Sequence, residues 1–328
     1  MTSSPTHTVP QEGRKPRRLG LYLPWALALI LVVAWSLAWL WLARETGRHI
    51  DARAAALRSA GWQASWGSRR VYGYPFRLDA DFTDLKLADP TGWAVELPQA
   101  KAEAYVYAPT RWLIAAPAGL TFTRPAGGPV SVSARVLRAS INSWEKRPPN
   151  ISVEGADLTL TPGPGARPFW LTAAKSLQFD TRAAPDDQGA VYLSIGGGVA
   201  SPQTWMGQVA RGAPIDLTLD GVVFRAGTMV GADWREAVRN WTHSGGGLQI
   251  RQLTLTAGDA SLDSRRGSLA VADDGTLVGQ LDTNLGEPER LFGGLSAKPD
   301  ETQTLRITFH DGSAWLGKLR IAPAPDLF

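Results

Sequence analysis

The stretch LYLPWALALILVVAWSLAWLWLA, residues 21–43, contains no charged side chain. A helix rises about 1.5 Å per residue, so roughly 20 such residues cross the hydrocarbon core of a bilayer. Pro24 falls in the first turn, where a missing backbone N–H removes no internal hydrogen bond. Trp25, Trp39 and Trp41 lie near the two ends, where tryptophan favours the headgroup region. The stretch therefore predicts a transmembrane helix that anchors the rest of the chain.

Basic side chains stand on both sides of this helix, so a simple count of charges does not orient it. The four that precede it are tightly clustered: Arg14, Lys15, Arg17 and Arg18. Those that follow are spread out and mixed with acids, and long downstream domains translocate largely regardless of their charge. We therefore expect a cytoplasmic N-terminus. A cleaved signal peptide is the alternative, but the apolar stretch is too long for one and no small-residue cleavage site precedes Arg44.

The sequence on either side of the anchor changes character. The polar, proline-containing start is typical of disorder. After the anchor, Ile50, Ala54 and Leu57 recur at helical spacing, and Gly61 is a natural stop. We expect a disordered cytoplasmic tail over residues 1–20, the transmembrane helix over 21–43, a helical stem over 44–61 and a strand-rich domain over 62–328.

From Trp62 onward, apolar and polar residues alternate with a period of two. The clearest runs are 76–82, 130–134, 158–161, 215–220, 253–256 and 305–309. Such alternation gives strands with one buried face and one solvated face, which is typical of antiparallel sheets. Asp274 and Gly275 predict a hairpin with a type I′ turn, and a change of phase at Gln252 predicts a β-bulge. The fold class we expect is mainly β, a large curved antiparallel sheet with a few short helices.

Helices after the stem are few. The best is residues 233–242, where Asp233 and Glu236 form an N-cap and N3 pair. Weaker ones are expected over 202–211 and 287–291. The similar segments LTLTPGPGA at Leu158 and LTLTAGDAS at Leu253 leave open a fold of two similar halves, with a subdivision near residues 165–200. Common strand vocabulary explains this similarity nearly as well.

The residues that usually carry chemistry are absent or badly spaced. The chain has no cysteine, which excludes disulfides and thiolate sites, and its four histidines have no metal-binding spacing. Residues 312–318 match the first seven positions of a phosphate-binding loop, but Leu319 stands where Ser or Thr is needed and Pro323 prevents the following helix, so a hairpin is expected. The net charge is only +4, with no basic and aromatic block that would suggest nucleic-acid binding. We expect no enzyme, cofactor or metal.

Aromatic residues are the remaining candidates for a binding site. Core packing explains most of the 14 tryptophans, but some aromatic positions suit a groove for an acyl chain or peptide. These are Tyr74, Phe76, Trp112, Phe169 and Trp170. A simpler interpretation has Gly73 and Pro75 shaping a turn, after which Phe76 enters the core on the first strand.

Two blocks of sequence carry a resemblance to a family. They are Gly73-Tyr74-Pro75-Phe76-Arg77-Leu78 and the tail DGSAWLGKLRIAPAPDLF, residues 311–328. With the preceding anchor, the chain after Gly47 resembles the bacterial envelope proteins grouped as domain of unknown function 2125. The resemblance implies an inner-membrane anchor and a periplasmic domain but no catalytic residues. The architecture is also loosely similar to anchored, groove-forming β proteins of the AsmA-like kind, which are associated with lipid handling.

These observations favour one function over its rivals. The first hypothesis is a non-enzymatic periplasmic protein, anchored in the inner membrane, that presents a concave and partly apolar sheet surface to lipid or another hydrophobic ligand. The alternative is a structural or assembly factor that binds another envelope protein, for example by strand addition. A hydrolase with an unrecognised site is the third hypothesis.

Overall fold

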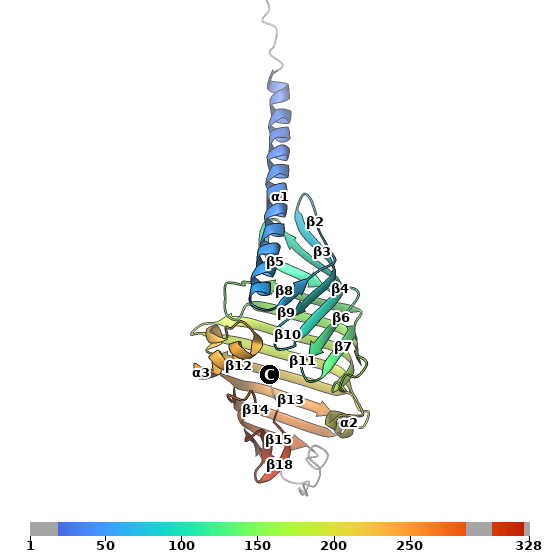
Figure 1. Cartoon of the computed structure of the whole chain (residues 1–328), viewed down its shortest axis with the longest axis vertical. Coiled ribbons are helices and arrows are strands. Elements are labelled where there is room, and N and C mark those ends of the chain that lie inside the picture. Colours follow the sequence, from blue (N-terminus) through green and yellow to red (C-terminus); the bar gives the residue numbers. More distant parts are fainter. Residues whose placement is uncertain (1–18, 287–303, 325–328) are drawn as a thin grey trace, which may run out of the picture.

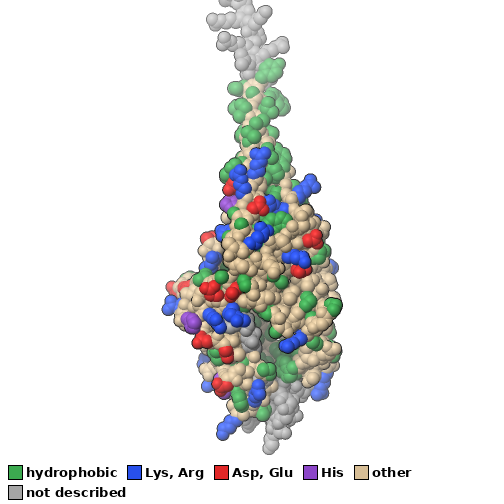
Figure 2. Space-filling view, viewed as in Figure 1, with side chains coloured by type: hydrophobic (Ala, Val, Ile, Leu, Met, Phe, Trp, Pro, Cys, Tyr) green, Lys and Arg blue, Asp and Glu red, His purple; other side chains and the backbone are tan. Residues whose placement is uncertain are grey.

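The computed structural model describes residues 19–286 and 304–324. The predicted anchor and stem form one helix, α1 (Leu19–Ser59), whose first half projects from the β domain (Figure 1). Figure 2 shows hydrophobic side chains along the projecting part and charged ones where α1 reaches the domain. Its length and composition suit a membrane span, and equally a signal sequence near the N-terminus. The basic cluster Arg14, Lys15, Arg17 and Arg18 and the expected helix over 287–291 lie outside the described residues.

The rest of the described chain is mainly β, as predicted. The strands are β1 (Gln63–Ser65), β2 (Ser68–Tyr72), β3 (Arg77–Ala88), β4 (Ala94–Tyr105), β5 (Ala108–Ala115), β6 (Leu120–Arg124), β7 (Gly128–Ser133), β8 (Val136–Asn142), β9 (Asn150–Pro162), β10 (Leu171–Ala184), β11 (Gln188–Ala200), β12 (Ile215–Phe224), β13 (Gly247–Ala257), β14 (Ala260–Val271), β15 (Leu277–Gly286), β16 (Thr304–His310), β17 (Ser313–Leu316) and β18 (Leu319–Pro323). The short helices are α2 (Trp205–Ala210), the 3₁₀ turn η1 (Ala226–Thr228) and α3 (Trp234–His243).

The strands form one antiparallel sheet (Figure 1). At three positions in it two short strands share one partner: β1 and β2 both pair with β3, β5 and β6 with β4, and β7 and β8 with β9. Between β4 and β9 the order departs from that of the chain, because β5 pairs with β8 and β6 with β7. Every other described strand pairs with its neighbours in the chain. Hairpin connections of this kind suit antiparallel pairs, because they need only short turns.

The register places apolar residues directly opposite one another across the whole sheet. Directly opposite residues point to the same face, so a row of pairs runs across the strands. The row, from β2 to β16, is Val71, Ala80, Ala102, Ile114, Ala139, Val153, Phe179, Leu193, Leu219, Leu253, Ser264, Thr283 and Leu305. We call this face the apolar face. Ser264 and Thr283, its two polar members, are both fully buried.

The adjacent row of pairs faces the other way and is polar at all but one position. It consists of Arg70, Asp81, Lys101, Ala115, Arg138, Glu154, Gln178, Ser194, Thr218, Thr254, Asp263 and Asn284. Salt bridges such as Arg138–Glu154, with a nitrogen–oxygen distance of 2.6 Å, lie along it. The predicted alternation of a buried and a solvated face is therefore confirmed.

The helices cover parts of the sheet near its margins. Ile50 of the α1 stem packs on Ala80 and Phe82, while α2 packs on Ile215 and Ala257. α3 starts at the predicted N-cap: the Asp233 carboxylate accepts from the backbone N–H of Glu236 at 2.8 Å. The Glu236 side chain in turn accepts from the N–H of Ala232 at 2.7 Å. The helices over 233–242 and 202–211 are thus confirmed, the second in shorter form.

Local predictions within the sheet had mixed outcomes. The bulge near Gln252 is confirmed, since Gln252 and Ile250 pair with adjacent residues of β12 and leave Arg251 as the extra residue. The hairpin around Asp274 is also confirmed, and residues 312–318 lie in a hairpin, as expected, rather than in a phosphate loop. The type I′ turn is wrong.

The turn between β14 and β15 is a three-residue loop. The Ala272 N–H donates to the Thr276 carbonyl, and only Gly275 has a positive φ, of 94°. A type I′ turn needs positive φ at both central residues. The Asp274 carboxylate instead accepts from the Thr276 N–H at 2.9 Å, which is the usual way an aspartate stabilises a turn.

Candidate functional site

The loop between β2 and β3 is fastened to α1. The Trp35 indole N–H donates to the Pro75 carbonyl, and the Trp39 indole N–H donates to the Arg77 carbonyl, both at 2.9 Å. The rings also meet, since Trp39 packs edge-on against Tyr74 with ring centres 5.6 Å apart. These contacts join residues about 40 positions apart, so they fix the end of the sheet beside the helix.

The same loop satisfies its backbone carbonyls one after another. Besides the two indole bonds, the Phe76 carbonyl accepts from the Val106 N–H in the β4–β5 turn at 3.0 Å. The Tyr74 hydroxyl is 2.8 Å from Ser36 Oγ. The three successive backbone carbonyls of residues 75–77 therefore each accept a hydrogen bond from a protein N–H group and need none from water. Such an arrangement lets a loop enter an apolar environment, where an unpaired carbonyl would be costly.

Gly73 is required for this loop. Its φ is +108°, and a Cβ there would lie 2.8 Å from the Arg77 carbonyl oxygen. An L side chain would therefore be strained by its backbone angle and would also collide with the loop. Phe76 does not enter the core as expected. It is 63% exposed and lies 6.3 Å from the Trp35 ring, because the loop turns outward to α1 before β3 begins.

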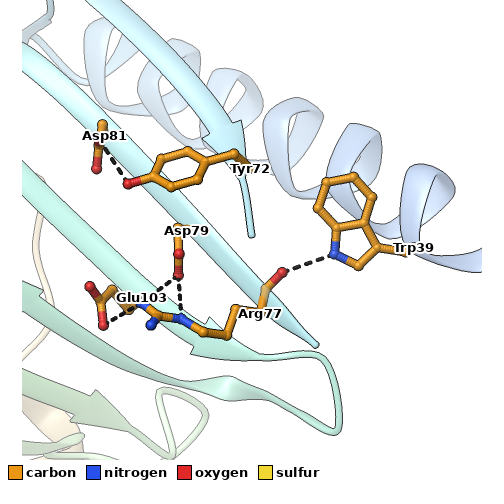
Figure 3. Close-up of polar contacts among 6 residues, drawn as sticks. All are labelled: Trp39, Tyr72, Arg77, Asp79, Asp81 and Glu103. Atoms are coloured by element: carbon orange, nitrogen blue, oxygen red, sulfur yellow. Dashed lines mark hydrogen bonds and ion pairs between the residues drawn. The ribbon is translucent and has the colours of Figure 1, made fainter. Parts of the chain in front are cut away.

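A charged network stabilises the start of β3 on the polar face (Figure 3). The Arg77 guanidinium contacts the Asp79 carboxylate at 3.0 Å and the Glu103 carboxylate at 2.7 Å. Asp79 is buried, and burial raises the pKa of its carboxyl despite the opposing hydrogen bond from Arg77. The hydrogen bond to Asp81 raises the pKa of the Tyr72 hydroxyl. The network holds the carbonyl of Arg77 where the Trp39 indole reaches it.

A cleft of about 470 Å³ lies next to this loop, between the ends of β4, β5 and β8. Its lining combines aromatic rings with a few charges: Arg77, Glu103, Tyr105, Tyr107, Arg111 and Trp112. The Tyr105 and Tyr107 rings stack with centres 5.0 Å apart. Trp112 pairs with Ile141 in register and stands two residues before Ile114, so its position belongs to the apolar face. Glu103, Leu113 and Ser140 are paired in register on the polar face, so residues of both faces line the cleft at the ends of these strands.

Most members of the apolar row are only half-buried. In the middle strands these include Leu193, Leu219 and Leu253, whereas Ile195 and Ile250 on the same face are buried. Figure 2 shows a hollow in the surface below the lower end of α1. Leu193, Leu219 and Leu253 are paired in register, so they form a continuous apolar strip rather than scattered exposed residues.

The five aromatic residues proposed for a groove lie in three places. Tyr74 and Phe76 contact α1, and Trp112 lines the neighbouring cleft. Phe169 and Trp170 are elsewhere, packed on the apolar core around β7 and β9. The structure therefore brings three of them to the same end of the sheet and keeps two apart.

Sequence reasoning missed the helix side of this site. Trp35, Ser36 and Trp39 were assigned to the membrane segment alone, although their spacing of one and four residues places them on one helix face. That spacing was the available signal. Tyr105 and Tyr107 carried no comparable pattern. Within the described ranges, no group of three or more His, Asp or Glu side chains is placed to hold a metal ion.

Comparison with known proteins places this arrangement in a family. A family model described as an uncharacterized protein conserved in bacteria, domain of unknown function 2125, matches residues 39–306. The chain belongs to this family. Its matched region begins at Trp39 and so includes the last turns of α1, the fastened loop and nearly all of the sheet. Neither a curated protein nor a solved structure gives a significant match.

Proposed function

We propose that this member of the family is a non-enzymatic protein, anchored by α1 in the bacterial inner membrane, whose periplasmic sheet presents its apolar face to a lipid or another hydrophobic ligand. The observation that carries the proposal is the continuous row of paired apolar residues, most of which are only half-buried. A cytoplasmic N-terminus is supported by the clustered basic residues before the helix.

The energetic reason is the apolar area left near water. A soluble sheet gains stability by covering such a strip, at about 25 cal/mol per Å² of apolar surface removed from water. Leu193, Leu217 and Leu219 keep part of that surface accessible, so an acyl chain laid across the strands would be stabilised by the same effect. The polar face offers no such gain, because all but one member of its row are polar or charged.

Photocrosslinking tests the proposal directly. We would place a photoreactive benzoyl-phenylalanine at Leu219 on the apolar face and, as a matched control, at the adjacent Thr218 on the polar face. Lipid adducts found by mass spectrometry at Leu219 and absent at Thr218 are the expected result. Adducts to another envelope protein at Leu219 would instead favour the assembly-factor alternative, and equal labelling at both positions would refute a selective apolar surface.

A further inference from the structure

The fastened loop lies level with the apolar part of α1, not beyond it. The Tyr74 hydroxyl meets Ser36, and the Pro75 carbonyl meets the Trp35 indole. Ala43, the end of the apolar stretch, is seven residues further along, or about 10 Å at 1.5 Å per residue. The loop tip therefore reaches back along the helix into the uncharged segment.

If the membrane ended on the N-terminal side of the loop contacts, the remaining apolar helix would be too short to cross the bilayer. Residues 19–34 span only about 24 Å, whereas a hydrocarbon core is about 30 Å thick. The span cannot shift toward the N-terminus, because Arg17 and Arg18 directly precede the helix and charges are costly in the core. A bilayer around α1 must then extend to the level of the loop tip.

The surface at this level suits the edge of a bilayer. Phe76 is 63% exposed, Tyr74 51% and Tyr107 76%, and all three belong to the β2–β3 and β4–β5 turns. Exposed aromatic rings are unfavourable in water but favoured at the membrane interface. The paired carbonyls of residues 75–77 remove the main cost of placing a loop there. We call Tyr74, Phe76 and Tyr107 the aromatic lip.

The cleft beside the lip has one cation without a partner. Arg77 is neutralised by Asp79 and Glu103, whereas the Arg111 guanidinium makes no ion pair or hydrogen bond within the described part of the chain. Aromatic rings of Tyr105 and Tyr107 line the same cleft. A guanidinium without an ion-pair partner is suited to a phosphate group, because it donates several hydrogen bonds in one plane.

We propose that the aromatic lip inserts into the bilayer leaflet on the side of the β domain, so that the cleft opens among the headgroups and Arg111 binds the phosphate of a phospholipid. This inference rests on the proposed anchoring by α1. It identifies the ligand class as a phospholipid of the surrounding bilayer, and it places the headgroup of that lipid in the cleft at the ends of β4, β5 and β8.

Depth measurements test the insertion. The chain has no cysteine, so a single cysteine can carry an environment-sensitive fluorophore at Phe76 or Tyr107, with Lys318 in the far β17–β18 hairpin as control. In nanodiscs, the labels at Phe76 and Tyr107 should be quenched by nitroxide lipids and protected from aqueous iodide. Iodide quenching as strong at Phe76 as at Lys318 would overturn the proposal. All three substituted side chains are exposed, so folding is not at risk.

A second measurement tests the phosphate site. Benzoyl-phenylalanine at Leu113, which lines the cleft, should yield phospholipid adducts. Arg111→Gln should reduce their yield about tenfold, since a hydrogen bond to a charged group is worth about 1.5 kcal/mol or more, and Arg111→Lys should retain most of it. An unchanged yield in Arg111→Gln would refute the phosphate site. Lipid adducts at Leu219 without adducts at Leu113 would leave the proposed function intact and this inference refuted.

Discussion

Replacing Trp39 by phenylalanine should loosen the loop from α1. Trp39 is only 8% exposed, and its indole N–H donates to the Arg77 carbonyl at 2.9 Å. Phenylalanine keeps an aromatic ring against Tyr74 but removes the donor. Trp41, two residues on, is 62% exposed, so Trp41→Phe is the matched control on the same helix.

The size of the effect follows from the lost hydrogen bond. Leaving a poorly hydrated carbonyl without its partner costs about 1–3 kcal/mol, which raises the population of the detached loop roughly 5- to 150-fold. The remaining contacts, from Trp35 and the rings, should keep the detached state a minority. The population of the detached loop therefore rises by a large factor but remains too small to be seen in a static structure.

Hydrogen exchange detects such minority states, because amide exchange scales with the open population. The Arg77 N–H donates to Gly73, and the Val106 N–H donates to Phe76, so both report on the docked loop. In nanodiscs, peptides containing these amides should exchange faster in Trp39→Phe by the factor above and be unchanged in Trp41→Phe. Equal protection in Trp39→Phe and the unsubstituted protein would show that the indole bond does not hold the loop.

Three further predictions concern stability. Leu281→Ala, at a buried position, should cost about 2–5 kcal/mol in chemical denaturation. Leu219→Ala should cost clearly less, because Leu219 is only partly buried, and equal losses would mean that the apolar face is closed at Leu219. Gly73→Ala and Gly165→Ala both place alanine at positive φ, a strain of about 1 kcal/mol, but only Gly73 lacks space for a Cβ, so it should lose more in thermal denaturation. Burial raises the pKa of the Asp79 carboxyl in the folded state, so the protonated carboxyl contributes fully to stability below the unfolded-state pKa near 3.8. This contribution is lost as the pH rises through the folded-state pKa. In a pH series of denaturation curves, Asp79→Asn should flatten the decline in stability, and an unaltered slope would contradict the assignment.

The strand-rich fold was predictable because its signals are local. Alternation in runs such as 215–220 and 305–309 depends only on each strand having one wet face, and the structure shows it. The N-cap at Asp233 was equally local. The turn after β14 differs from the predicted type I′ turn, and in it the Asp274 carboxylate accepts a hydrogen bond from the Thr276 N–H.

The placement of the candidate site was less predictable. Tyr74, Phe76 and Trp112 were named from their residue types, but nothing in the local pattern distinguished them from Phe169 and Trp170, which the fold uses as packing. The difference arises from contacts with distant parts of the chain. The outward course of Phe76, in particular, follows from partners on α1 that lie about 40 residues earlier.

By itself, the sequence determined that this chain has one long uncharged helix followed by many two-faced strands. Each of those properties follows from the spacing of apolar and polar residues that are close together in the sequence. The tertiary structure alone decided that the buried faces align into one row from β2 to β16 and that the Gly73–Arg77 loop docks beside Trp35 and Trp39. Register depends on every intervening turn and bulge, because a shift of one residue reverses the face of a strand, and such long-range consequences cannot be read from any local stretch.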